Sequence, residues 1–312
     1  MDPPSLHFTR EGDGPVILFL HGFPTDGRLW GPLVEGLRAR HTCIVVDLPG
    51  CGASPALPGG GLDPDGIVHR LEALRAGLGV GAWRIVGHDA GAVVAAHYAA
   101  RHPARVEGLV LMAAPLFPDF EPPAIVRAIR RRWLGDAIAP LVVRGLQAFL
   151  ATTLTRDDPR NRRIVRGFAA HYSGLAGARR FVRLARWGDP AVVLGRTAAI
   201  LPTITAPTLI VHGARDAAIG LSFAERAAAA IPGARLHVED CGHFCPLDAA
   251  GPLAVRMAAF LAGAPDRATA ALIHRTVVTR RYRATTVSAA TRARTAAASA
   301  SGLSPHQRSA VS

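Results

Sequence analysis

The sequence predicts an α/β fold in which a doubly wound, mostly parallel sheet is interrupted by an inserted helical segment. Two observations carry this prediction. Short apolar runs recur along the chain and alternate with helix-like segments, which is the pattern of parallel strands joined by helices. The alternation stops near residue 116 and resumes near residue 201, and the interval is filled with Arg- and Ala-rich helical segments.

Six apolar runs have the length and residue content of strands buried on both faces. In chain order they are VILFL (16–20), CIVV (43–46), WRIVG (83–87), VEGLVLM (106–112), TLIVHG (208–213) and RLHVED (235–240). Helices are expected over LWGPLVEGLRAR, DGIVHRLEALRAGLG, AGAVVAAHYAARHP and SFAERAAAAIP. The predicted organisation is an α/β core over 1–115 and 201–263, a helical cap over 116–200, and a low-complexity basic tail over 264–312 that we expect to be disordered.

Composition narrows the class of protein. The chain has 312 residues, 49% of them hydrophobic, which is enough for a large buried core. The net charge of +13 comes entirely from arginine and gathers in the cap and the tail, without the interleaved aromatics of a nucleic-acid-binding motif. Four scattered cysteines predict reduced thiols. We expect a cytoplasmic protein with no nucleic-acid or membrane partner and no bound metal or cofactor, and no oligomeric state is predicted.

The segment VGHDAG places Asp89 between a predicted strand and a predicted helix. Gly87 and Gly91 lie two residues away on each side, where a Cβ would collide with neighbouring backbone. The turn directs the Asp89 side chain to the carboxyl end of the sheet, where open α/β sheets bind ligands. The helix that follows favours an ionised carboxylate at its N-terminus.

Three further segments end at the same edge of the predicted sheet. The HGFP turn (21–24) follows the first strand and can present the backbone N–H of Phe23 to Asp89. Asp216 follows a later strand, and His243 follows the last one. A candidate nucleophile, an acid and a histidine in this chain order predict one site at the strand ends.

Over residues 6 to 263 the chain resembles the α/β-hydrolase fold family. The HGFP turn, the DLPGCGAS loop (47–54) and the elbow GHDAG (87–91) carry the resemblance. An aspartate at the elbow resembles the branch that includes epoxide hydrolases and haloalkane or haloacetate dehalogenases. The resemblance implies a cofactor-free hydrolase. The implied roles are nucleophile for Asp89, base for His243, orienting acid for Asp216 and oxyanion donors for the N–H groups of Phe23 and Ala90, supported by His21, Gly22, Pro24, Gly87, His88 and Gly91.

The leaving group decides between the substrate classes. A carboxylate nucleophile attacks an sp³ carbon and forms an alkyl ester, which water then cleaves. The expected substrate is a small apolar organic molecule, with water as co-substrate. Epoxide opening needs an acid, for which Tyr172 in the cap is the candidate. Carbon–halogen hydrolysis is the alternative, although Ala90 stands where dehalogenases carry a halide-binding tryptophan. The candidate pocket residues are Trp30, Trp133 and Trp187.

Two other interpretations remain open at this point. The chain can be a small-ligand-binding protein on a hydrolase scaffold, although a binding pocket needs neither a base nor an oxyanion turn. Cys241 and Cys245 flank His243 with metal-like spacing, but a histidine that serves Asp89 is not free to ligate zinc, and no metal site is predicted.

Overall fold

The computed structural model describes residues 6–57, 63–152, 158–186 and 188–263. A seven-stranded sheet lies at its centre, in the order β1-β3-β2-β4-β5-β6-β7. Only β1 is antiparallel to its neighbour; the other pairs are parallel. The strands are β1 (Phe8–Glu11), β2 (Val16–Leu20), β3 (Thr42–Val46), β4 (Trp83–His88), β5 (Val106–Met112), β6 (Thr208–Gly213) and β7 (Arg235–Glu239).

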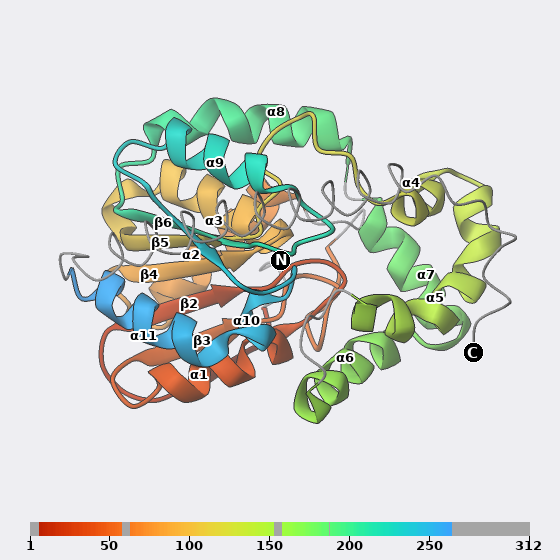
Figure 1. Cartoon of the computed structure of the whole chain (residues 1–312), viewed down its shortest axis with the longest axis horizontal. Helices are drawn as coiled ribbons and strands as arrows, with labels where there is room; N and C mark the ends of the chain where they lie inside the picture. The colour runs from red at the N-terminus through yellow and green to blue at the C-terminus, as the bar shows by residue number, and fades with distance from the viewer. Residues whose placement is uncertain (1–5, 58–62, 153–157, 187, 264–312) are drawn as a thin grey trace, which may run out of the picture. The chain divides into compact units, whose positions relative to one another are not determined.

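Helices cover both faces of this sheet, as Figure 1 shows. Helices α1 and α11 pack against each other on one face, and α2, α3, α8 and α9 cover the other. The core helices are α1 (Gly31–Leu37), α2 (Pro64–Gly77), α3 (Ala90–Arg101), α9 (Leu221–Ala230), α10 (Cys245–Asp248) and α11 (Ala250–Leu261). The doubly wound α/β sheet predicted from the sequence is therefore confirmed.

Five helices occupy the interval between β5 and β6, where the sequence predicts a helical insertion. They are α4 (Ala124–Arg130), α5 (Leu134–Thr152), α6 (Pro159–His171), α7 (Gly174–Ala185) and α8 (Pro190–Ile200). Asp158 and Asp189 cap α6 and α8 through side-chain bonds to backbone N–H groups, and a proline follows each cap. We call α4 to α7 the cap; Figure 1 shows them beyond one end of the strands.

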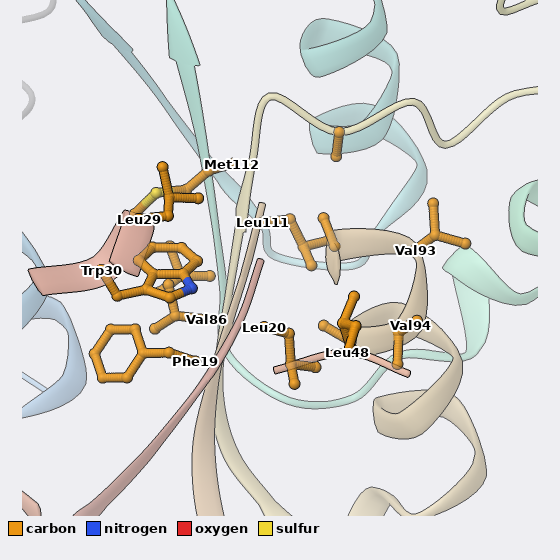
Figure 2. Close-up of a cluster of buried hydrophobic side chains, with 14 of the residues drawn as sticks. Phe19, Leu20, Leu29, Trp30, Leu48, Val86, Val93, Val94, Leu111 and Met112 are labelled. Carbon is orange, nitrogen blue, oxygen red and sulfur yellow. The ribbon is translucent and has the colours of Figure 1, made fainter. Parts of the chain in front are cut away.

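The central strands are buried on both faces, which is why their sequences are continuously apolar. Figure 2 shows Phe19 and Leu20 of β2 pointing to opposite sides of the sheet. On one side the ring of Trp30 packs at 5.2 Å from that of Phe19. Trp30 is fully buried there. Its proposed place in the substrate pocket is therefore wrong: it is a core residue.

Candidate active site

Asp89 sits at the sharp turn between β4 and α3. Its backbone adopts φ 51° and ψ −120°, a conformation that non-glycine residues rarely take. Helix α3 crosses β2 so closely that a Cβ on Gly91 would lie 2.2 Å from the carbonyl oxygen of Leu20. The close packing keeps the turn strained, and the strain aims the carboxylate out of the sheet.

The HGFP turn after β2 holds this carboxylate. The backbone N–H of Phe23 donates to Asp89 Oδ2 at 3.0 Å, and the peptide between Phe23 and Pro24 is cis. His21 fixes the turn as a neutral ring: its Nε2 accepts from the N–H of Leu48 at 2.9 Å, so its Nδ1 donates to the carbonyl of Gly22 at 2.8 Å. Burial lowers the pKa of His21, in agreement with the neutral tautomer.

Gly22 leaves no space for a side chain beside Asp89. A Cβ there would lie 2.5 Å from both Cβ and Oδ2 of Asp89. We expect Gly22→Ala to displace the carboxylate from the Phe23 N–H and to lower kcat by roughly 100- to 1,000-fold, the loss seen when one such donor is removed. Gly31→Ala is the matched control, because a Cβ on Gly31 meets nothing within 4 Å. Equal kcat values for the two variants would contradict this role for Gly22.

His243 and Asp216 form a buried pair next to the elbow. His243 Nδ1 donates to Asp216 Oδ2 at 2.9 Å, and the Asp216 side chain is fully buried. Asp216 Oδ1 accepts the N–H groups of Ala218 and Ile219 at 2.8 and 3.0 Å. Because Nδ1 is engaged by Asp216, Nε2 is the ring nitrogen left for chemistry in the cavity.

Burial and the neighbouring charges shift the pKa values of Asp216, His243 and Asp89. Burial raises the pKa of Asp216, but the charge and hydrogen bond of His243 and the two N–H donors outweigh it and hold the pKa at about 2. Burial lowers the pKa of His243, yet Asp216 and then Asp89 raise it above the ordinary 6.5. Burial raises the pKa of Asp89, and His243 and the N–H groups of Ala90 and Phe23 offset this only in part.

His88 lies beneath the site and does not line the cavity. Its Nε2 lies 3.0 Å from the carbonyl oxygen of His243, and the two rings are 4.7 Å apart. Burial lowers the pKa of His88 to about 3, with a further lowering by His243. A neutral His88 whose Nε2 donates to that carbonyl positions the loop that carries His243.

Asp89 and His243 open into a cavity of about 530 Å³ between the strand ends and the cap. The rest of its described lining is apolar and comes from the HGFP turn, the loop after β5, helices α4, α5 and α7, and the segments next to Asp216 and His243. Phe181, Leu146 and Phe120 are examples. Asp89 and His243 are therefore the only ionisable side chains among the described residues that line this cavity.

The expected proton donor is not among these lining residues. Tyr172 is buried, its ring packs against Phe23 and Phe181, and its hydroxyl lies 4.0 Å from the sulfur of Cys51. Tyr172 thus forms a second layer behind the cavity wall, and its predicted role as acid is corrected. The Trp133 side chain is 84% exposed and does not line the cavity either. Trp187 and the tail 264–312 lie outside the described residues.

The cysteines near His243 do not build a metal site. Cys241 and Cys245 are buried thiols, and Cys245 donates to the carbonyl of Gly242 at 3.3 Å. Within the described residues, no group of three or more His, Cys, Asp or Glu side chains is arranged to hold a metal ion.

Comparison with known proteins gives the family. Residues 15–250 match the model of the α/β hydrolase fold. The chain belongs to the α/β-hydrolase fold family. This hydrolase-fold chain is 30% identical over 272 residues to the cis-3-alkyl-4-alkyloxetan-2-one decarboxylase of Shewanella oneidensis, covering 82% of the chain and 85% of the relative.

Other relatives of this hydrolase-fold chain are named for different reactions. It is 31% identical over 244 residues to the pimeloyl-acyl-carrier-protein methyl ester esterase of Chromobacterium violaceum, covering 75% of the chain and 88% of the relative. It also resembles the crystal structure of an ancestral haloalkane dehalogenase, with a TM-score of 0.67, 25% identity, and coverage of 83% of this chain and 95% of the other. The family therefore establishes the α/β-hydrolase fold, and the substrate class has to be argued from the residues that line the cavity.

The apolar cavity wall is the part of the site that the sequence did not single out. Its residues lie mainly on α4 and α5, where apolar side chains recur at helical spacing. That spacing predicts a buried stripe on a helix, but it does not tell whether the stripe faces another helix or a cavity. The strand-end residues carried a clearer signal, because motif and topology pointed to one place.

Proposed function

We propose that Asp89 is a nucleophile that opens a β-lactone ring bearing two alkyl chains, and that the ring carboxylate is the leaving group. The observation that carries this proposal is the cavity lining, where Asp89 and His243 are the only ionisable side chains among the described residues. An ionised carboxylate suits attack on an sp³ carbon, and backbone N–H groups hold it in place.

The three candidate substrates differ in what the cavity lining must supply to the leaving group. An epoxide leaves as an alkoxide and needs an acid to protonate it. A halide is a weakly basic anion that gains from N–H donors pointing into the cavity. A β-lactone opens to a carboxylate leaving group. The conjugate acid of this group has a pKa of about 4, so the carboxylate is stable at neutral pH and needs no proton. The described lining offers no hydroxyl or indole donor, which favours the lactone.

The apolar wall supports the same substrate class. The relative in Shewanella oneidensis is named for an oxetan-2-one with alkyl groups on two neighbouring carbons. Two alkyl chains need a large cavity without polar side chains, and Phe181, Leu146 and Phe149 contribute to such a wall here. Transfer of the two alkyl chains of the substrate from water to this cavity supplies binding free energy of roughly 0.8 kcal/mol per buried CH₂ group.

The reaction balances without water, redox partner or proton. Asp89 attacks C4 of the ring; the C4–O bond breaks, and its electron pair leaves with the ring oxygen as a carboxylate attached to C3. The bond from C3 to this carboxylate then breaks, and its pair forms the C3=C4 double bond. The C4–O bond to Asp89 breaks in the same step and returns its pair to Asp89. The products are CO₂ and an alkene.

His243 fits this reaction as a fixed positive charge. One negative charge moves from Asp89 to the substrate carboxylate and back to Asp89. An imidazolium whose pKa is raised by Asp216 and Asp89 can pair with the charge at both places without giving up its proton. Asp216 keeps the charge on the ring through the Nδ1 hydrogen bond.

The test is a turnover experiment in H₂¹⁸O with a cis-3,4-dialkyl-oxetan-2-one. We expect CO₂ and a cis-alkene, and an Asp89 peptide of unchanged mass after many turnovers, because Asp89 is regenerated without water. A hydroxy acid as product, together with ¹⁸O in the Asp89 carboxylate, would instead show hydrolysis of an ester intermediate and would contradict the lactone proposal.

Carbon–halogen hydrolysis is the second candidate. It is favoured by the buried pair of His243 and Asp216, which is the arrangement of a base that activates water, and by the likeness to the haloalkane dehalogenase structure. Released halide would establish it. Epoxide opening, the substrate class favoured by the sequence, lacks its acid in the described lining. A binding protein for an apolar ligand has no use for a buried Asp89 carboxylate, whose desolvation is unfavourable.

A further inference from the structure

Five large apolar residues of α4, α5 and the segment that joins these helices are exposed. They are Ile125, Trp133, Leu134, Leu141 and Phe149, and we call them the cap patch. The Trp133 side chain is 84% exposed and that of Leu141 is 72% exposed. Single exposed apolar residues are ordinary, but a group that includes a tryptophan marks a surface for another molecule.

Helix α5 has an unusual composition for a surface helix. Its residues Leu134–Ala151 are long and apolar enough to cross a membrane, with a mean hydropathy of 1.3, but only 28% of them are buried. One side of α5 packs on α4, α6 and α7. The helix is therefore part of the cap, and its other side exposes apolar residues to solvent, as in helices that lie in a lipid interface.

The cap patch shares three of its five residues with the active-site cavity. Ile125, Leu141 and Phe149 are exposed and also line the cavity that holds Asp89. An apolar molecule can therefore pass from the outer surface to the cavity along apolar side chains. These shared residues place the patch at an entrance of the site.

Exposed arginines are neighbours of the cap patch along the chain. Arg131 and Arg132 directly precede Trp133, and Arg144 lies on α5 three residues after Leu141. The two acidic residues of the described segment 120–152 are already paired, Glu121 with Arg127 and Asp136 with Arg186. Residues 116–200 as a whole contain fifteen arginines and six acidic residues. A surface that complements the patch must be apolar in its interior and negatively charged at its face.

We propose that the cap patch docks on the surface of an anionic lipid bilayer. Trp133 and Leu134 enter the headgroup region, and Arg131 and Arg132 bind lipid phosphates. A second copy of this chain fits less well, because a two-fold contact would set the arginines of one patch against those of the other. The proposal reverses the sequence-based expectation of no membrane partner, and it goes beyond the proposed function because no step of it involves Asp89.

The test uses the full chain and vesicles of phosphatidylcholine, with and without phosphatidylglycerol. We expect flotation with the anionic vesicles and a weaker partition onto the neutral ones. Trp133→Asn with Leu134→Gln removes apolar contact and should lower the partition by more than roughly tenfold. Asparagine tolerates the positive φ of 69° at position 133, so the local backbone is retained.

A second pair of substitutions tests the charge. Arg131→Gln with Arg132→Gln should weaken partition onto anionic vesicles by roughly 30-fold and leave partition onto neutral vesicles unchanged. The matched control is Val255→Asn on α11, a side chain that is 75% exposed outside the patch, and this variant should bind like the unchanged protein.

Three results would overturn the proposal: no flotation with either vesicle, flotation that both double variants retain, or a dimer that Trp133→Asn dissociates, which would assign the patch to a second copy. The measurement needs no substrate. If the protein does not bind vesicles, the lactone proposal is unaffected. If the protein does not turn over the lactone, the proposal of docking on a bilayer is unaffected.

Discussion

Asp89→Asn is expected to lower kcat by roughly 10⁴-fold or more, the scale on which removal of a nucleophile acts in enzymes with a comparable site. The amide keeps the shape of the side chain and tolerates the φ of 51° at this turn. It removes the negative charge that attacks the substrate. Steady-state turnover and intact-protein mass together measure the effect, because the mass shows whether the amide has hydrolysed back to the acid.

Stability distinguishes this loss from misfolding. The folded state raises the pKa of Asp89, chiefly by burial. A carboxyl group with a raised pKa binds its proton more tightly in the folded than in the unfolded state, so its ionised form disfavours folding at neutral pH. Asp89→Asn should therefore have a Tm equal to or above that of the unchanged protein at pH 7. Turnover that survives in a correctly folded, undeamidated Asp89→Asn would rule out a covalent role for Asp89.

The strands and the strand-end residues were predictable because their signals are local. The predicted runs 16–20, 106–112 and 208–213 coincide with β2, β5 and β6. In a parallel sheet the carboxyl ends of all strands meet at one edge, so Asp89, Asp216 and His243 needed only their strands to be placed. This common edge brings His243 close enough to Asp216 for the hydrogen bond that the structure shows between them.

Strand β1 was missed for a physical reason. It is a four-residue antiparallel edge strand, and three of its residues are exposed. An edge strand of this kind buries little apolar surface, so it leaves neither an apolar run nor an alternating pattern in the sequence. Its partners on β3, such as Val45 opposite Thr9, come from a distant part of the chain.

The aromatic residues were misplaced because their environment depends on tertiary packing. Tyr172 directly follows α6 as its C-cap, and its hydroxyl turns toward Cys51, 121 residues away. The sequence does not distinguish the environments of Trp30 and Trp133, yet Trp30 is buried against Phe19 and Trp133 is exposed. Helical periodicity gives the face of a helix, but the neighbour of that face is set by how the cap helices pack on the core.

His243→Gln is expected to lower kcat by roughly 100- to 10,000-fold, the usual contribution of a group that handles charge or protons at this position. Ester hydrolysis and lactone decarboxylation differ in whether an alkyl ester accumulates on Asp89 of this variant. If His243 activates water, its loss leaves an alkyl ester on Asp89 that persists and adds the mass of the bound alkyl fragment. If His243 stabilises the substrate carboxylate, its loss raises the energy of the ester intermediate, and no adduct should build up.

The pH dependence of the unchanged protein gives the same distinction with the opposite sign for each chemistry. Asp216 and Asp89 raise the pKa of His243 above 6.5, although burial lowers it. A base must be neutral, so hydrolysis of the ester gains kcat as pH rises through the pKa of His243. A charge-stabilising imidazolium must be protonated, so lactone decarboxylation loses kcat over the same interval. We expect the loss. The negative charge that Asp89 loses on esterification passes to the substrate carboxylate, so the imidazolium keeps an anionic partner, and kcat and kcat/KM should fall in the same direction as pH rises.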